Sequence, residues 1–183
     1  NVEVEGEKLS LDEVHAICYL LFLASVDTVA VMLSFITRHL ARDQALFAYL
    51  KADQKRIGDS VDELLRMHAF INLNRICATD VKFHGVQFRE GDNIVIPSFV
   101  TDRDERVFAS PDSFNPDRSK RERNQHHAFG AGAHKCVGLH LAKMEVRSVL
   151  EALIKRVDHI ELISEEGVTG HGGTTMGLDT LPI

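Results

Sequence analysis

Apolar residues recur at helical spacing through the first part of the chain. The longest such stretch covers residues 10–42, and it opens with Ser10 and Glu13, a combination typical of a helix start. Two shorter periodic stretches cover residues 43–51 and 57–67. The pattern therefore predicts one long helix followed by two shorter helices.

The period changes from helical to alternating near residue 75. Residues 75–100 alternate apolar and polar positions around glycine-containing turns, which predicts a small β-meander. Residues 101–125 are polar and rich in turn residues, so an irregular loop is expected there. Helical spacing returns over residues 139–157, and the glycine-rich region 160–183 is expected to form a hairpin. The fold class predicted is mainly α with small β-sheets.

The centre of the first helix approaches the length of a membrane span. Residues 16–36 contain few polar side chains, the most polar being Asp27. A carboxylate near the middle of a lipid-embedded helix is costly, whereas a helix that is apolar on all sides suits the centre of a large globular protein. We therefore expect a buried helix and no membrane span.

Composition and charge favour an ordinary globular protein. The chain has 183 residues, of which 44% are hydrophobic and 26% charged, and its formal net charge is -6, so nothing points to nucleic-acid binding. The three cysteines, Cys18, Cys77 and Cys136, are too few and too scattered for a disulfide framework. A reducing, cytoplasmic location fits best.

Residues 129–138, which read F-G-A-G-A-H-K-C-V-G, carry the strongest chemical signal. They place the Cys136 thiol after a glycine-containing loop and at the start of a helix, whose positive end favours a thiolate. Gly130 and Gly132 leave room for a large flat group against the backbone. A zinc cluster of Cys136 with three nearby histidines fits the usual ligand spacings poorly, and a lone cysteine is more often a small buried hydrophobe. The three histidines are His126, His127 and His134.

This stretch resembles the haem-binding loop of the cytochromes P450, in which a cysteine thiolate is the axial iron ligand. The resemblance implies that Cys136 binds the iron of haem b and that residues 129–157 form the haem-thiolate loop and its following helix. It also implies that Phe129 and Gly130 lie beside the haem and that His134 contacts a propionate.

Residues 24–28, A-S-V-D-T, resemble the oxygen-activating segment of the same family, usually written [AG]-G-x-[DE]-T. Activation of dioxygen needs protons, so the resemblance implies that Asp27 and Thr28 relay them, with Ala24 beside the haem. Ser25 stands where glycine is usual. Taken alone, Asp27 and Thr28 would be read as a solvated polar pair at a helix bend.

Two further motifs of the family involve charged residues. Glu63 and Arg66 form an E-x-x-R pair, and residues 114–118, F-N-P-D-R, resemble the loop that supplies a second arginine, here Arg118. The resemblance implies a buried structural network of these three. Arg75 stands where the family places an arginine on a haem propionate. Without the resemblance, a surface ion pair and a strand-edge arginine would be the simpler interpretations.

The resemblance implies that the chain is the C-terminal part of a P450, about half of the enzyme. The parent would be a monooxygenase that inserts one oxygen atom of O2 into an apolar small molecule, with electrons from a ferredoxin and its NAD(P)H-dependent reductase. Two alternatives are a peroxide-dependent haem-thiolate enzyme, against which the acid-alcohol pair argues, and an inactive haem-binding fragment. The residues implied to line the substrate pocket, which could equally be core, are Leu20, Leu23, Ile71, Leu73, Thr174 and Thr175.

Overall fold

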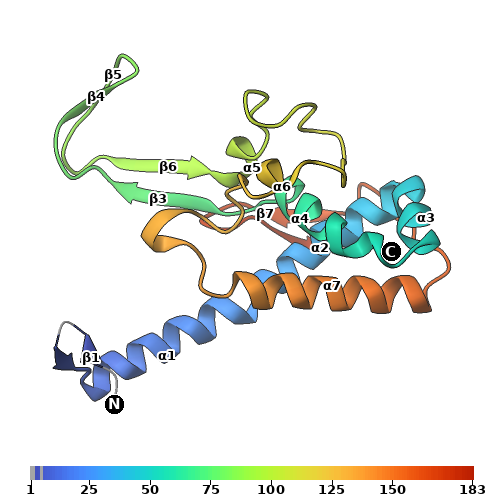
Figure 1. Ribbon diagram of the computed structural model, residues 1–183, viewed down its shortest axis with the longest axis horizontal. Coiled ribbons are helices and arrows are strands. Elements are labelled where there is room, and N and C mark those ends of the chain that lie inside the picture. Colours follow the sequence, from blue (N-terminus) through green and yellow to red (C-terminus); the bar gives the residue numbers. More distant parts are fainter. Residues whose placement is uncertain (1–2, 5) are drawn as a thin grey trace.

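The computed structural model describes residues 3–4 and 6–183 of the chain. Its fold is mainly α with small β-sheets, as predicted. The longer helices are α1 (Leu11–Val26), α2 (Thr28–Arg42), α3 (Gln44–Ala52), α4 (Arg56–Met67) and α7 (Leu139–Arg156) (Figure 1). Short helical turns are α5 (Ser98–Thr101), α6 (Lys120–Arg123) and the 3-10 turn η1 (Gly132–His134).

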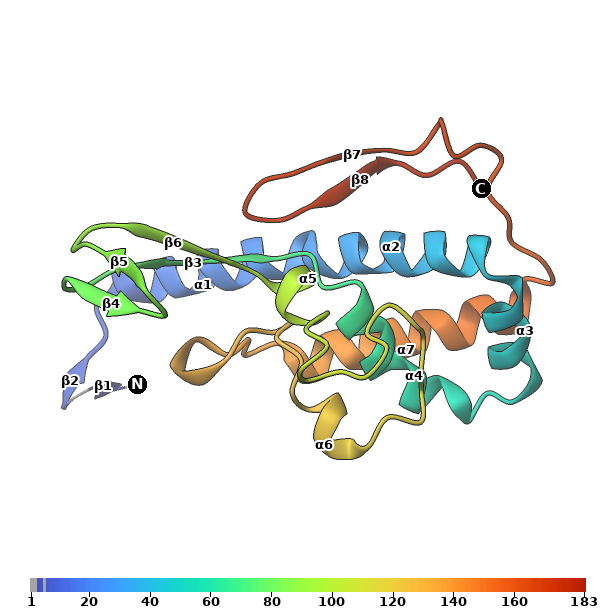
Figure 2. The same ribbon diagram turned by 90° about the horizontal axis from the view of Figure 1, so that it is seen from above.

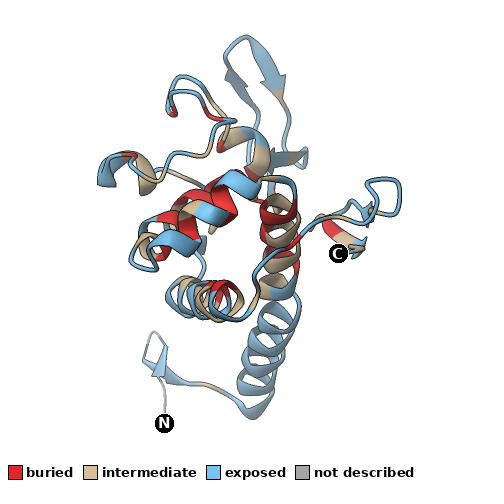
Figure 3. Cartoon of the chain, turned by 90° about the vertical axis from the view of Figure 1, so that its right-hand side faces the viewer, coloured by how far each residue is buried: buried red, intermediate tan, exposed pale blue. Residues whose placement is uncertain are grey.

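The apolar core lies where α2, α3, α4 and α7 meet (Figure 3). Each of these helices has apolar residues at i, i+3, i+4 or i+7, and these positions turn inward. Burial of one such side chain stabilises the fold by about 1.5–3 kcal/mol relative to leaving it exposed. Side chains exposed by 1% or less at this centre include Ile36, Leu40, Leu50, Ile57, Leu64, Leu65, Val146, Leu150 and Ile154.

The first helix departs from the prediction in two ways. It begins as expected, because the Ser10 hydroxyl accepts a hydrogen bond from the Glu13 N–H and the Glu13 carboxylate accepts one from the Ser10 N–H. It does not run unbroken over residues 10–42, because Asp27 interrupts it between α1 and α2. Nor is it buried throughout: every residue of α1 is exposed, and only α2 enters the core.

By length and composition alone, Leu11–Arg42 could also cross a membrane, and 11% of its most apolar window is buried. The central helix of a larger globular protein meets the same criteria. Figures 1 and 2 show α1 projecting from the helical body of the molecule.

The described part of the chain contains four two-stranded antiparallel sheets rather than a meander. Strand β3 (Asn72–Ile76) pairs with β6 (Asn93–Pro97), and the hairpin of β4 (Val81–Phe83) and β5 (Val86–Phe88) is enclosed between them. The predicted β-meander over 75–100 is wrong because β3 pairs with the distant β6 instead of with β4, so β4 and β5 pair only with each other, through a tight turn in which His84 and Gly85 take positive φ. The other two sheets pair β1 (Glu3–Val4) with β2 (Glu7–Lys8) and β7 (Thr169–His171) with β8 (Gly177–Thr180).

The predicted hairpin over 160–183 is present, with its paired strands limited to residues 169–180. The segment between β7 and β8 contacts the residue just before β3, because Thr175 and Ile71 form an isolated antiparallel bridge. The predicted irregular loop over 101–125 contains α6, whose start is capped by Ser119 and Glu122 in the same manner as α1.

Candidate functional site

The Cys136 loop turns on two glycines in the left-handed region. Gly130 has φ +67° and Gly132 has φ +65°, a conformation that side-chain-bearing residues rarely adopt. The turn is closed by hydrogen bonds from the Gly130 N–H to the His127 carbonyl at 2.8 Å and from the Cys136 N–H to the Phe129 carbonyl at 2.9 Å. These bonds bring the thiol residue back beside the start of the loop.

The Cys136 thiol is exposed beside the first turn of α7. Its Sγ lies 3.8 Å from the position that a Cβ on Gly138 would occupy, and Gly138 is the N-cap of α7. The free backbone N–H groups of a helix start favour a negative charge at such a place. The arrangement therefore presents a sulfur donor, exposed to solvent, beside the start of α7.

The surroundings of the thiol fit a large flat group such as haem. A Cβ on Gly132 would have open space around it, and a Cβ on Gly130 would lie 3.5 Å from the His134 carbonyl oxygen and 3.8 Å from Leu73 Cδ2. A cysteine sulfur is a soft metal ligand, and glycine backbone beside it leaves room for the flat face of a macrocycle. Figures 1 and 2 show this loop, α1 and the β3–β6 ribbon extending from the helical body in the same direction.

The interruption at Asp27 has a local cause. The Thr28 hydroxyl donates to the Ala24 carbonyl at 2.8 Å, and the Ser25 hydroxyl donates to the Phe22 carbonyl at 3.0 Å. Hydroxyls bonded back to carbonyls one turn earlier compete with the backbone ladder and open a helix. Asp27 is exposed and Thr28 is half-buried, so both functional groups stand at the break.

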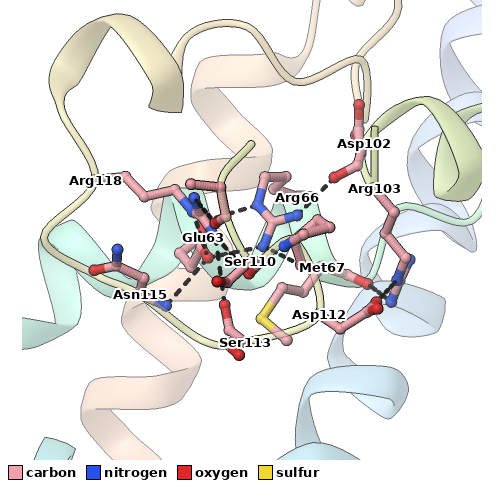
Figure 4. A network of polar contacts seen from close by, with 12 residues as sticks. Glu63, Arg66, Met67, Asp102, Arg103, Ser110, Asp112, Ser113, Asn115 and Arg118 are labelled. Atoms are coloured by element: carbon pink, nitrogen blue, oxygen red, sulfur yellow. Dashed lines mark hydrogen bonds and ion pairs between the residues drawn. The ribbon is translucent and has the colours of Figure 1, made fainter. Parts of the chain in front are cut away.

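Glu63, Arg66 and Arg118 meet in a buried network (Figure 4). Glu63 Oε1 accepts from Arg66 Nη2 at 2.8 Å and from Arg118 Nε at 2.9 Å, and Oε2 accepts from Arg66 Nε at 2.9 Å. The Asn115 N–H adds a fourth bond at 3.1 Å. Burial alone would raise the pKa of Glu63, but the hydrogen bonds and charges of both arginines outweigh it and hold that pKa below its usual range.

Both arginines also bind the irregular loop. Arg66 donates to the carbonyls of Asp102 and Pro111, at 2.6 and 2.7 Å, and Arg118 donates to the Ala109 carbonyl at 2.8 Å. The network therefore joins α4 to the segment that precedes the Cys136 loop. In a helix or sheet, backbone carbonyls accept hydrogen bonds from backbone N–H groups. In this irregular loop, the two arginine side chains donate those hydrogen bonds instead.

The remaining sequence-predicted positions fall into two groups. Ile71, Leu73, Thr174 and Thr175 come together where β3 meets the C-terminal hairpin, and the Asn72 N–H donates to the Thr174 carbonyl at 2.8 Å. Leu20, Leu23 and Ala24 are instead exposed on α1. Arg75 and His134 are also exposed, and the Arg75 guanidinium donates to the Asn74 carbonyl at 2.7 Å.

The zinc alternative has no support in the geometry. Within residues 3–4 and 6–183, no group of three or more His, Cys, Asp or Glu side chains could hold a metal ion. His126 instead turns inward and packs against Phe129, with ring centroids 6.0 Å apart. Burial lowers the pKa of His126 to about 4.

One buried acid escaped the sequence reasoning. Asp102 is 0% exposed, and its carboxylate accepts a hydrogen bond from the His127 N–H at 2.6 Å. In the sequence it opens the run D-R-D-E-R, which looks like a solvated turn. Only the tertiary contacts show that its first residue is inside: Asp102 bonds to Arg66 of α4 (Figure 4) and to His127 at the start of the Cys136 loop.

The sequence model of the family described as cytochrome P450 matches residues 1–166. The chain belongs to the cytochrome P450 family. It is 32% identical over 179 residues to probable cytochrome P450 127A1 of Sinorhizobium fredii, covering 98% of the chain and 42% of that protein. It is 33% identical to a steroid C26-monooxygenase of Mycolicibacterium smegmatis, covering 92% of the chain and 41% of that protein.

Solved P450 structures show the same fold. The crystal structure of CYP101J2 superposes with a TM-score of 0.89 at 31% identity, covering 99% of the chain and 45% of that structure. CYP108D1 from Novosphingobium aromaticivorans gives a TM-score of 0.84 at 33% identity, with 99% and 43% covered. The chain thus spans less than half the length of the P450 relatives it matches.

Proposed function

We propose that the enzyme containing this chain is a haem-thiolate monooxygenase that inserts one oxygen atom of O2 into an apolar small molecule. The observation that carries the proposal is the exposed Cys136 thiol in a double-glycine turn at the start of α7. Haem b bound there would supply the activation of dioxygen, a chemistry that the cofactor and not the protein performs.

In this proposal Cys136 is the axial iron ligand, and the backbone of Phe129 and Gly130 lies against the macrocycle. Arg75 and His134, both exposed on this side of the fold, bind propionates, since a guanidinium matches a carboxylate geometrically. Ala24 borders the haem from α1.

Asp27 and Thr28 carry the proton transfer. The Thr28 hydroxyl donates its hydrogen to the Ala24 carbonyl, so its oxygen is free to accept a hydrogen bond from a donor such as water. Asp27 stands exposed at the same break, where it can exchange protons with solvent. A positioned acid of this kind contributes typically about a hundredfold or more to a rate.

The substrate side is proposed from apolar residues and from relatives. Leu20, Leu23, Ile71 and Leu73 would line the pocket together with two threonines of the C-terminal hairpin, Thr174 and Thr175. Relatives include proteins named steroid C26-monooxygenase and, at 31% identity, vitamin D3 dihydroxylase of Streptomyces griseolus. Their names support an apolar small molecule as the substrate class.

We also propose a ferredoxin-type electron donor and a cytoplasmic location. Similarity to bacterial P450 proteins supports both proposals. The exposed Asp27 in the middle of the apolar run supports a helix covered by protein rather than by lipid, because a carboxylate at that depth in a bilayer is costly.

Cys136→Ser in the intact enzyme tests the proposal. The variant should lose the Soret band that marks a thiolate-ligated ferrous carbonyl complex, because serine offers no soft thiolate to the iron. Cys18→Ser, at an exposed cysteine of α1, is the matched control and should keep the band. A Cys136→Ser variant with an unchanged band would overturn the assignment.

A further inference from the structure

Asp102 joins the ion network of α4 to the loop that carries Cys136. It is the C-cap residue of α5, and its own N–H donates to the Ser98 carbonyl at 2.9 Å. Its backbone carbonyl accepts from Arg66 Nη1 at 2.6 Å, while its side-chain Oδ1 accepts from the His127 N–H at 2.6 Å. One residue therefore contacts the network with its main chain and the loop with its side chain.

The contact at His127 lies at the origin of the Cys136 turn. The His127 carbonyl accepts from the Gly130 N–H at 2.8 Å, and the Phe129 carbonyl accepts from the Cys136 N–H at 2.9 Å. A displacement of the His127 backbone would therefore be passed through two short hydrogen bonds to the thiol. Because residues 131–137 are all exposed, the loop between Gly130 and α7 has few packed side chains of its own to resist such a displacement.

The second oxygen of the same carboxyl is buried without a partner. Asp102 Oδ2 has no hydrogen-bond partner among residues 3–4 and 6–183. Burial raises the pKa of Asp102 to about 7, and the nearby polar groups of His127, Ala128 and Thr101, together with the Arg66 charge, offset only part of that effect. The ionisable groups that face it are Arg66 from α4 and the ring of His127 from the loop, whose Nδ1 lies 3.7 Å from Oδ1.

We propose that Asp102 is a positioning residue for the haem-thiolate loop, and that the proton on its buried carboxyl controls how firmly the loop is held. The proposal rests on the assignment of Cys136 as the haem ligand. In the closed loop the carboxyl is buried, and in an opened loop it meets water. The buried carboxyl keeps its proton more readily than one exposed to water. The closed loop is therefore most stable below pH 3.8, and this extra stability is lost as the pH rises from 3.8 to about 7.

The test uses Asp102→Asn, which keeps the acceptor oxygen and cannot ionise, and Asp102→Ala, which removes the acceptor. Asp104→Asn is the matched control, because Asp104 pairs with Arg106 and lies two residues away. The readouts on the intact haem protein are the rate of haem release to an apo-acceptor and the amide-exchange protection of Gly130 and Cys136, both measured across this pH range.

Relative to Asp102→Asn, wild-type protection should fall by up to about tenfold per pH unit as the pH rises toward about 7, with a parallel rise in haem release. Asp102→Ala should release haem faster at every pH, and Asp104→Asn should follow the wild type. If Asp102→Ala fails to fold, the pH profiles of the wild type and Asp102→Asn still test the inference.

Identical pH profiles for the wild type and Asp102→Asn would overturn the inference. A wild-type protein without a thiolate-type carbonyl spectrum would overturn the proposed function instead. In that case, amide exchange at Gly130 and Cys136 would still show whether Asp102 holds the loop.

Discussion

His39 Nδ1 lies 2.7 Å from His68 Nε2, and this hydrogen bond joins α2 to the residue that caps α4. The two rings meet edge to face with centroids 4.9 Å apart, and the His68 ring also stacks on Phe35. A hydrogen bond between two imidazoles requires at least one neutral ring, because one nitrogen must accept. Burial lowers the pKa of both histidines, that of His68 to about 3, so the pair is uncharged near neutrality.

Acid should weaken the contact between α2 and α4. The folded-state pKa of His68 lies below its ordinary 6.5, so its contribution is complete above pH 6.5 and is lost as the pH falls toward about 3. His68→Gln should reduce the acid loss of unfolding free energy by at least about 1.4 kcal/mol, the equivalent of one pKa unit. Urea unfolding of the intact protein at several pH values measures this, with the exposed His159→Gln as the control. Equal acid losses in His68→Gln and the wild type would contradict it.

Glu63→Gln should destabilise the protein strongly. The substitution leaves two buried arginine charges without their common partner, and breaking a buried pair in this way costs about 3–5 kcal/mol. Because the pKa of Glu63 is lowered, the wild-type contribution is present above pH 4.5 and is lost as the pH falls through the lowered value.

Urea unfolding near neutral pH measures the cost of Glu63→Gln. The matched control is Glu151→Gln on α7, which breaks a more exposed pair with Arg147 and should change stability little. Equal effects of the two substitutions would show that the Glu63 network is not a structural support of the fold.

Thr28→Ala should impair coupling rather than substrate binding. It removes the hydroxyl at the helix break but no apolar surface of the proposed pocket, so substrate affinity should persist while the rate of productive turnover falls by about a hundredfold. NAD(P)H would still be consumed, with hydrogen peroxide as the main product. Thr28→Ser, which keeps a hydroxyl, should retain most of the coupling. Unchanged product per NAD(P)H in Thr28→Ala would exclude this role.

Residues 1–183 expressed alone should self-associate and should not hold haem stoichiometrically. All of α1 is exposed and strongly apolar, with Leu20, Phe22 and Val26 each more than 60% exposed, and such a patch promotes association. Sedimentation and dye binding would measure this, and Phe22→Glu should reduce both. A soluble monomer with a cooperative thermal transition and one tightly bound haem would contradict the expectation.

Some features of this chain could be predicted because they depend on a few consecutive residues. The Ser10–Glu13 cap forms since both groups lie within one turn of backbone. The missing Cβ atoms at Gly130 and Gly132 can be read from the sequence, and both residues adopt the positive φ that residues with a Cβ rarely adopt. The spacing of Glu63 and Arg66 places both on one face of α4 whatever else surrounds them.

Other features were decided by tertiary structure alone. The pairing of β3 with β6, the burial of Asp102 and the contact between His39 and His68 join residues distant in the chain. A charged run such as the one that begins at Asp102 has the same composition whether it is exposed to solvent or buried in the protein. Only the elements packed against Asp102 determine the free energy of its carboxylate. The sequence by itself therefore determined the order and local spacing of the reactive and charged side chains, and the tertiary structure determined which of those charges are buried, because burial depends on elements distant in the chain.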